Sequence, residues 1–113
     1  MKELYNRVIS IVTESSNGKS LIELSTELEV PIIDIMDCLM VAVGFKRLYA
    51  TSSGENYDKI ITYTSTKING CLYDTRDQLL IEGIRLGLDR PDVISEDNWE
   101  YLKDLCRLCG EIN

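Results

Sequence analysis

Four cysteines are the side chains of this 113-residue chain that could most readily hold a metal ion. Cys106 and Cys109 have the spacing of half a zinc site, while Cys38 and Cys71 stand alone. The chain has no histidine, so a zinc ligand set would need the two isolated cysteines. Cys38 and Cys106 fall among apolar residues at helical spacing, where free cysteine packs as a small hydrophobic side chain. We expect structural cysteines and no cofactor, with a zinc site at Cys106 and Cys109 as the alternative.

The residue types give little support to catalysis. The sequence has no glycine-rich phosphate loop and no serine-nucleophile motif. A cysteine nucleophile needs an activating base, and the chain offers no imidazole. Carboxylates lie three residues apart at Asp34 and Asp37 and at Asp74 and Asp77, which is ordinary on a solvated helix face. The sequence therefore predicts a protein that is not an enzyme.

Charge is distributed unevenly along the chain, whose net charge is −7. Residues 1–19 carry +1, residues 20–44 carry −5, residues 45–70 carry +2 and residues 71–113 carry −5. The second of these blocks has five carboxylates and no lysine or arginine. Such a block favours basic partners and is repelled by phosphate backbones.

Length and composition are those of one globular domain. Apolar residues make up 44% and charged residues 27% of the chain, which is close to the average and gives no sign of disorder. No apolar run approaches the roughly 18–20 residues of a membrane span. Residues 1–5 lack the apolar core of a secretory signal. We expect a single domain over residues 1–113, located in the cytoplasm and without contact to a membrane.

Hydrophobic periodicity predicts a first helix from Lys2 to about Glu14. Its apolar face carries Leu4, Val8, Ile11 and Val12. Ser20 and Glu23 have the spacing of a capping box, in which each side chain accepts from a free backbone N–H of the other residue. A second helix should therefore begin at Ser20 and end before the Val30-Pro31 pair, because proline breaks a helix.

A third helix is expected from about Pro31 to Val43, since proline suits the first turn of a helix. The apolar residues that we expect it to bury are Ile32, Ile35, Met36, Leu39 and Met40. Asp34 and Asp37 are expected on its exposed face. Gly44 should end the helix in the left-handed conformation.

The pattern changes after this glycine. Residues 45–51 and 59–66 are rich in aromatic and β-branched residues, which is typical of strands. The polar, glycine-containing stretch 52–56 separates them. Two such runs around a loop of this kind predict a β-hairpin, with its tip near residues 53–56.

Two further helices are predicted in the last third of the chain. Thr75 and Gln78 have capping-box spacing and open a helix through about Leu86, with Gly87 behind it. Ser95 caps a last helix, whose apolar side carries Trp99, Leu102, Leu105, Cys106 and Cys109. The residues that we expect to be largely buried are Leu24, Leu28, Ile35, Leu39 and Trp99.

Helix, capped helix, tight turn, helix, glycine and hairpin is the order of the winged helix-turn-helix. The run from Leu21 to Pro31, followed by Ile35, Leu39, Gly44-Phe45 and Tyr63-Thr64, is similar to many bacterial and archaeal winged-helix regulators. In that family a small residue at the position of Ser25 lets two helices cross closely, and an apolar residue at that of Val30 plugs the core. Glu29 departs from the pattern, because members commonly have glycine there, which tolerates positive φ.

The resemblance covers residues 2–66, and residues 67–113 would form a C-terminal helical extension. It implies an α+β, mostly helical fold: a winged helix-turn-helix with a small β-hairpin wing, to which the sequence adds two C-terminal helices. In DNA-binding members the third helix enters the major groove, and lysine and arginine supply much of the affinity. This third helix has no cation, so the sequence argues against groove reading by it.

Two functional hypotheses follow. The favoured one is a small acidic winged-helix regulatory protein that binds a protein partner with a basic surface, through Asp34 and Asp37 or through the C-terminal helices. The partner would belong to a transcription, DNA-processing or nucleic-acid-targeting defence machine, and a virus- or plasmid-encoded inhibitor would fit this size and charge. The alternative is a transcriptional regulator that binds DNA through its first helix and its wing and forms a homodimer through the C-terminal helices. The basic residues that it would use in the wing are Lys46, Arg47, Lys59 and Lys67, although exposed lysines are also ordinary in a sheet.

Overall fold

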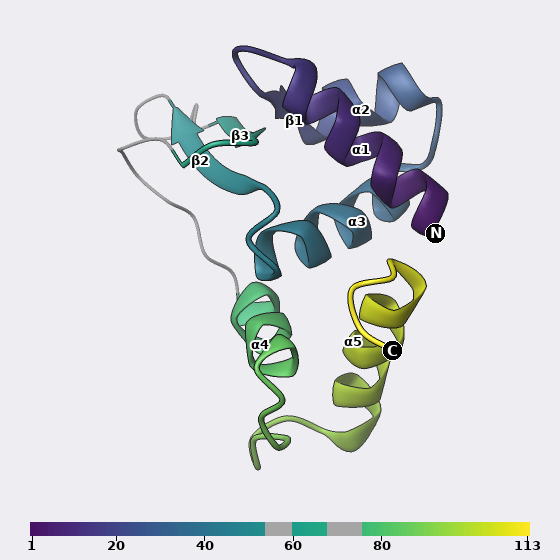
Figure 1. Ribbon diagram of the computed structural model, residues 1–113, viewed down its shortest axis with the longest axis vertical. Coiled ribbons are helices and arrows are strands. Elements are labelled where there is room, and N and C mark those ends of the chain that lie inside the picture. Colours follow the sequence, from purple (N-terminus) through teal and green to yellow (C-terminus); the bar gives the residue numbers. More distant parts are fainter. Residues whose placement is uncertain (54–59, 68–75) are drawn as a thin grey trace.

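The computed structural model describes residues 1–53, 60–67 and 76–113 (Figure 1). Within these ranges the chain is α+β, with five helices and a small three-stranded antiparallel sheet. The elements follow the order α1–β1–α2–α3–β2–β3–α4–α5. Figure 1 shows α3 in the middle of the molecule, with α1 and α2 on one side of it and α4 and α5 on the other. No helix in the described ranges has the length and apolar character needed to cross a membrane.

The first two helices lie where the sequence predicts them. α1 spans Lys2–Glu14, and α2 spans Leu21–Leu28. The capping box at the start of α2 is confirmed, because Ser20 Oγ accepts from the Glu23 N–H while the Glu23 carboxylate accepts from the Ser20 N–H. These two bonds satisfy backbone donors that a helix start otherwise leaves without partners.

Glu29 ends α2 in the left-handed conformation, with φ of 55°. It therefore adopts the backbone geometry that a glycine would adopt at lower cost. Ser25 stabilises the turn, since its hydroxyl donates to the Val30 carbonyl over 2.7 Å and its own carbonyl accepts from the Val30 N–H. The small side chain at this position thus also closes the connection between α2 and α3.

α3 spans Ile32–Gly44 and begins directly after Pro31. The expected left-handed end at Gly44 is wrong, because Gly44 is helical and the left-handed residue is Lys46, with φ of 59°. Gly44 serves a packing role instead. A Cβ on Gly44 would lie 2.7 Å from Ile81 Cβ and nearer still to Ile81 Cγ2, so α4 rests directly on the α3 backbone.

The expected hairpin is present, and its strands are shorter than predicted. β2 spans Tyr49–Ser53 and β3 spans Ile60–Thr64, with Tyr49 opposite Thr64 and Ser53 opposite Ile60. Residues 45–48 form a turn instead of a strand, because the N–H groups of residues 47 and 48 bond back to the Ala42 carbonyl. Ser52 and Ser53, expected in the loop, are instead the last two residues of β2, and the rest of the expected loop lies outside the described residues.

A third strand was not predicted. β1 comprises only Lys19 and Ser20, which pair with Tyr63 and Thr62 of β3, so the sheet order is β1-β3-β2. Gly18 precedes β1 with φ of 78°, and a Cβ there would lie 2.6 Å from the Tyr63 carbonyl oxygen. The absence of a side chain therefore lets the chain approach the hairpin closely enough to pair with it.

The last two helices occur as expected. α4 spans Arg76–Arg85, and Thr75 of the predicted capping box lies outside the described residues. α5 spans Glu96–Leu108, and Ser95 Oγ caps it by accepting from the Asn98 N–H. The predicted apolar side of α5 is confirmed, since all its members are buried: Trp99, Leu102, Leu105, Cys106 and Cys109.

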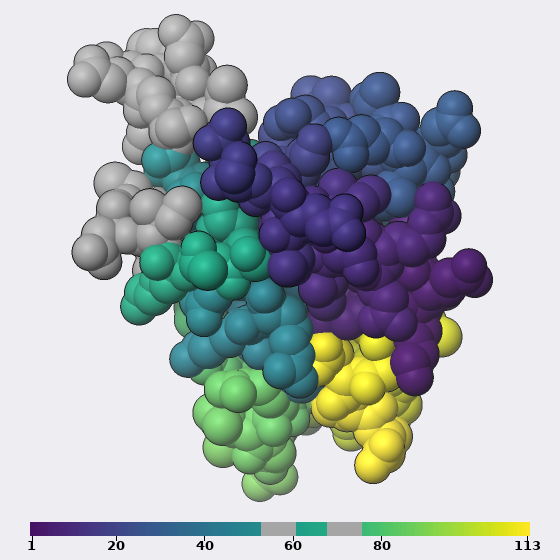
Figure 2. Space-filling view, turned by 45° about the horizontal axis from the view of Figure 1, so that its top comes forward, coloured from purple at the N-terminus to yellow at the C-terminus, as the bar shows by residue number. Residues whose placement is uncertain are grey.

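Buried residues from all five helices form one hydrophobic cluster. The five residues predicted for the core are buried: Leu24, Leu28, Ile35, Leu39 and Trp99. A polar contact joins distant segments beside this cluster. Tyr5 of α1 donates its hydroxyl to Glu111, which also accepts from the Arg47 guanidinium at 3.2 and 3.3 Å. Figure 2 shows the C-terminal segment in yellow against α1 in purple.

Candidate functional site

The outer side of α3 is apolar. Ile32, Ile33 and Met36 are exposed by 45, 61 and 48%, so the expectation that Ile32 and Met36 are buried is wrong. At 3.6 residues per turn these residues share one side of the helix with Met40 and Val43, which are only partly buried. We call this set of five residues the apolar stripe.

The stripe is exposed because the other sides of α3 already face neighbours. Ile35, Leu39 and Ala42 recur at helical spacing and are buried, as are Cys38 and Val41. α3 packs against α1 and α2 on one side and against α4 and α5 on the other. α3 has more apolar residues than these contacts cover, and the stripe is the part that they leave exposed.

Asp34 and Asp37 border this surface and are partly buried. Asp37 Oδ1 accepts from the Tyr101 hydroxyl at 3.3 Å. Burial raises the pKa of Asp37, the Tyr101 hydrogen bond lowers it, and the charge of Asp34 raises it further, for a net rise. Asp34 lies in the first turn of α3, where it complements the helix dipole. Among the described residues no lysine or arginine forms an ion pair with either carboxylate.

Sequence reasoning missed Tyr101 as a member of this surface. Its side chain is 53% exposed on α5 and reaches Asp37 of α3. Burial raises the pKa of Tyr101, as do the charges of Asp37 and Asp77. A hollow of about 290 Å³ lies beside it between α4 and α5, and its lining includes Arg76 and Asp77. The signal available in the sequence was an aromatic residue on the polar side of α5, which no local rule links to α3.

The cations predicted for a nucleic-acid interface are partly engaged within the protein. Lys46 Nζ lies 3.0 Å from Glu82 Oε1, and Arg47 makes the paired contact with Glu111 described above. Lys67 is exposed, whereas Lys59 lies outside the described residues. The hairpin therefore offers less free positive charge than its sequence suggests.

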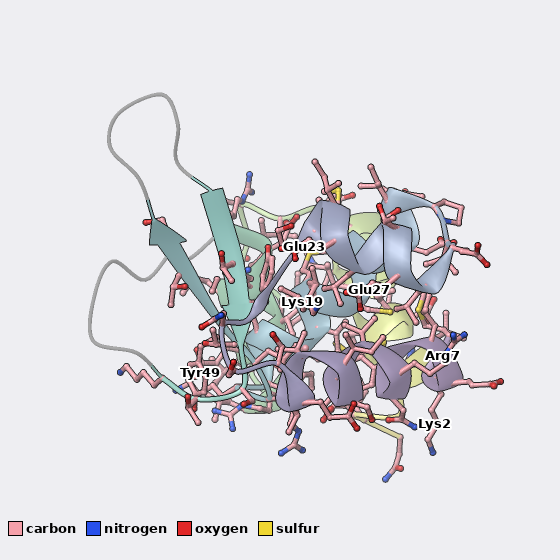
Figure 3. The ribbon with its side chains drawn as sticks, turned by 90° about the horizontal axis from the view of Figure 1, so that it is seen from above. Lys2, Arg7, Lys19, Glu23, Glu27 and Tyr49 are labelled. Atoms are coloured by element: carbon pink, nitrogen blue, oxygen red, sulfur yellow. The ribbon has the colours of Figure 1, made fainter. Side chains whose placement is uncertain are left out.

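A groove of about 750 Å³ runs between α1 and α2. Figure 3 shows Lys2 and Arg7 in the N-terminal half of α1, and both line the groove together with Glu3 and Glu27. Glu27 also pairs with Lys19 of β1. Positive and negative side chains balance here, so the groove has no electrostatic preference for an anionic ligand.

Further exposed apolar residues lie between the start of α4 and the end of α5: Leu79, Leu86, Leu88, Val93 and Leu108. Leu79 of α4 and Leu86, the residue after its end, are exposed by 60 and 61%. Glu82 lies between them in the sequence and is held by Lys46 and by Arg85, the latter at 3.2 Å. These residues belong to α4, to the connection after it and to the end of α5, so they do not share one side of a single helix as Ile32, Ile33 and Met36 do.

The described cysteines are Cys38, Cys106 and Cys109, and all three are buried free thiols. Burial raises the pKa of Cys106 to about 12. A hydrogen bond with Cys109, together with burial, raises the pKa of Cys38. Nucleophilic attack needs the thiolate, which the surroundings of Cys38 and Cys106 disfavour. Within the described ranges no group of three residues is placed to hold a metal ion, and Cys71 lies outside those ranges.

The surface with the most distinctive chemistry is thus the outer side of α3 with Tyr101 beside it. Comparisons with protein-family models, curated proteins and solved structures found no match for this chain. The interpretation of the site therefore depends on its own residues. It combines exposed apolar groups with carboxylates, and the block from Ser20 to Gly44 contains no cation.

Proposed function

We propose that this protein is an acidic interaction module of the winged helix-turn-helix type that binds a protein partner with a basic surface through α3. The observation that carries this proposal is the outer side of α3, where apolar side chains lie beside Asp34 and Asp37 without any cation on the same block. Proteins use apolar contacts bordered by charge to recognise other proteins.

The order of the elements supports the winged-helix interpretation. A capped helix, a tight turn at Glu29, a central helix and a hairpin follow one another in residues 20–64. In this interpretation α3 occupies the position of the recognition helix, and β2 and β3 form the wing. The function we propose uses the recognition helix for a protein surface in place of a DNA groove.

Electrostatics disfavour DNA as the ligand of α3. A DNA-binding surface gains most of its affinity by neutralising phosphates with lysine and arginine. Asp34 and Asp37 would instead face phosphates or base edges, and desolvating them without a counter-charge would be costly. Lys46 and Arg47 would have to leave Glu82 and Glu111 before they could contact a phosphate.

A partner that itself handles nucleic acid would carry a basic surface of the kind that α3 complements. An acidic module bound there would compete with nucleic acid for the same surface. We therefore propose a regulator or inhibitor of a transcription, DNA-processing or nucleic-acid-targeting defence machine.

A titration with fluorescent genomic DNA fragments, from about 50 to 200 mM salt, tests the proposal. We expect little binding near physiological salt, and residual low-salt binding should depend on Lys46, Arg47 and Lys59. In parallel, the wild type and Asp34→Lys and Asp37→Lys variants are used to capture partners from the source lysate. Loss of a captured protein on charge reversal supports the proposal. Tight, sequence-selective DNA binding that Asp34→Lys abolishes would overturn it.

A further inference from the structure

We propose that the apolar stripe is the centre of the docking surface and that its occupant is a basic amphipathic segment of the partner, with apolar side chains flanked by lysine or arginine. This inference rests on the proposed function and specifies the chemistry of the partner. The proposed contact differs from a purely electrostatic one, because much of its affinity would come from burial of Ile33 and Met36.

The exposure of the stripe is the first observation. Single exposed apolar residues are normal on protein surfaces, whereas contiguous ones mark interaction sites. Ile33 is 61% exposed, with Ile32 and Met36 on the same side of the helix and Met40 continuing the row. Met36 is unbranched and polarisable, so it adapts readily to the shape of a partner's side chains.

The border of the stripe is the second observation. Glu29 ends α2 just before the stripe begins, and Asp34 and Asp37 lie within α3 itself. Tyr101 adds an exposed aromatic side chain that is held by Asp37. Tyrosine is enriched among the residues that carry most of the energy of protein interfaces, and a charged border steers an oppositely charged partner.

The sign of the charge selects the occupant. A symmetric contact between two copies of this chain would bring the carboxylates of one α3 against those of the other, and residues 20–44 have no cation to offset them. Phosphates of nucleic acids and anionic lipid headgroups would be repelled in the same way. In a partner segment with lysine or arginine around apolar side chains, the apolar side chains can pack on the stripe and the cations can pair with the carboxylates at its border.

Three synthetic helical peptides serve as probes. The first has leucine on one face and lysine on the other, the second has serine in place of the leucine, and the third has glutamate in place of the lysine. Isothermal titration calorimetry measures their affinity for the wild-type protein. We expect the leucine–lysine peptide to bind most tightly. Ile33→Ser or Met36→Ser should weaken its binding by about tenfold, because each removes one apolar side chain from the contact. Asp34→Asn should reduce the salt dependence of binding.

Leu86→Ser is the matched control, because Leu86 is also 61% exposed but lies away from α3, directly after the end of α4. It should leave the affinity unchanged, and circular dichroism confirms that each variant remains folded. Equal binding of the serine–lysine peptide, or an affinity that Ile33→Ser leaves unchanged, would overturn the inference while the proposed basic partner would still stand. If neither lysine peptide bound, the inference and the proposed function would both fail.

Discussion

Substituting Gly44 by alanine sets two effects of opposite sign against each other. Alanine favours a helix interior over glycine by about 1 kcal/mol, so a free helix would gain stability. In the folded protein, however, the new Cβ would lie 2.7 Å from Ile81 Cβ, far inside ordinary contact distance. Both groups are buried and Ile81 is β-branched, so neither can move without shifting α4 away from α3. Overpacking of this kind typically costs about 1–3 kcal/mol.

Because the new Cβ would meet two Ile81 atoms far inside contact distance, we take the upper end of this range, about 3 kcal/mol. After the helix-propensity gain of about 1 kcal/mol, Gly44→Ala should be destabilising by about 2 kcal/mol net and should lower the melting temperature by several degrees. Urea unfolding followed by circular dichroism measures the change. Gly83→Ala in α4 is the matched control, because its Cβ would find its nearest neighbours at 3.9 Å and should leave stability unchanged or raised. The Gly44→Ala/Ile81→Ala double variant should cost less than the sum of the two single ones. A Gly44→Ala protein as stable as the wild type would refute direct packing of α4 on the α3 backbone.

Two other perturbations probe the interior. Leu24→Ala and Leu39→Ala should each lower the free energy of unfolding by about 2–5 kcal/mol, because both leucines are almost wholly buried. Unchanged melting temperatures in both variants would contradict the assignment of these leucines to the core. Burial raises the pKa of Cys106 from its ordinary value of 9.0 to about 12, so the folded state holds this proton more tightly than the unfolded state. Stability from this group is therefore complete below about pH 9 and is lost as the pH rises toward about 12. Urea unfolding at several pH values across that window measures how the free energy of unfolding falls as the pH rises. The fall should be shallower in Cys106→Ala than in the wild type, and equal slopes would count against an effect of burial on this thiol.

The features that the sequence predicted correctly depend on short-range chemistry. Ser20 with Glu23 and Ser95 with Asn98 interact within one helical turn, so their residue types and spacing determine the outcome. Periodicity likewise identified the buried side of α5. The pairing of β1 could not be found in this way, because a strand of two residues is too short to show the alternation of apolar and polar residues by which strands are recognised.

The errors arise where the result depends on distant parts of the chain. Periodicity identifies apolar residues of α3 but not which of its apolar sides finds a neighbour, and this is why Ile32 and Met36 were wrongly placed in the core. A local rule predicts Gly44 as a left-handed cap at the end of the third helix, whereas the helix does end there but the residue is helical and its constraint is Ile81 in another helix. The ion-pair partners of Lys46 and Arg47 are also remote in sequence, so no local pattern predicts that these cations form ion pairs within the protein.

The contact between Tyr5 and Glu111 also bears on how the protein forms during translation. The two residues are separated by 106 positions, so α1 leaves the ribosome long before the segment that completes its surroundings. At about 5–20 residues per second, that interval is roughly 5–20 s. Once residues 21–44 have emerged, Val8 and Val12 of α1 can pack against α3, while the surface that later receives α5 and Glu111 stays open to water. The nascent chain thus leaves Cys38, which hydrogen-bonds with Cys109 in the folded protein, open to the cell for seconds, and that is the period in which a chaperone or a premature contact would act on it.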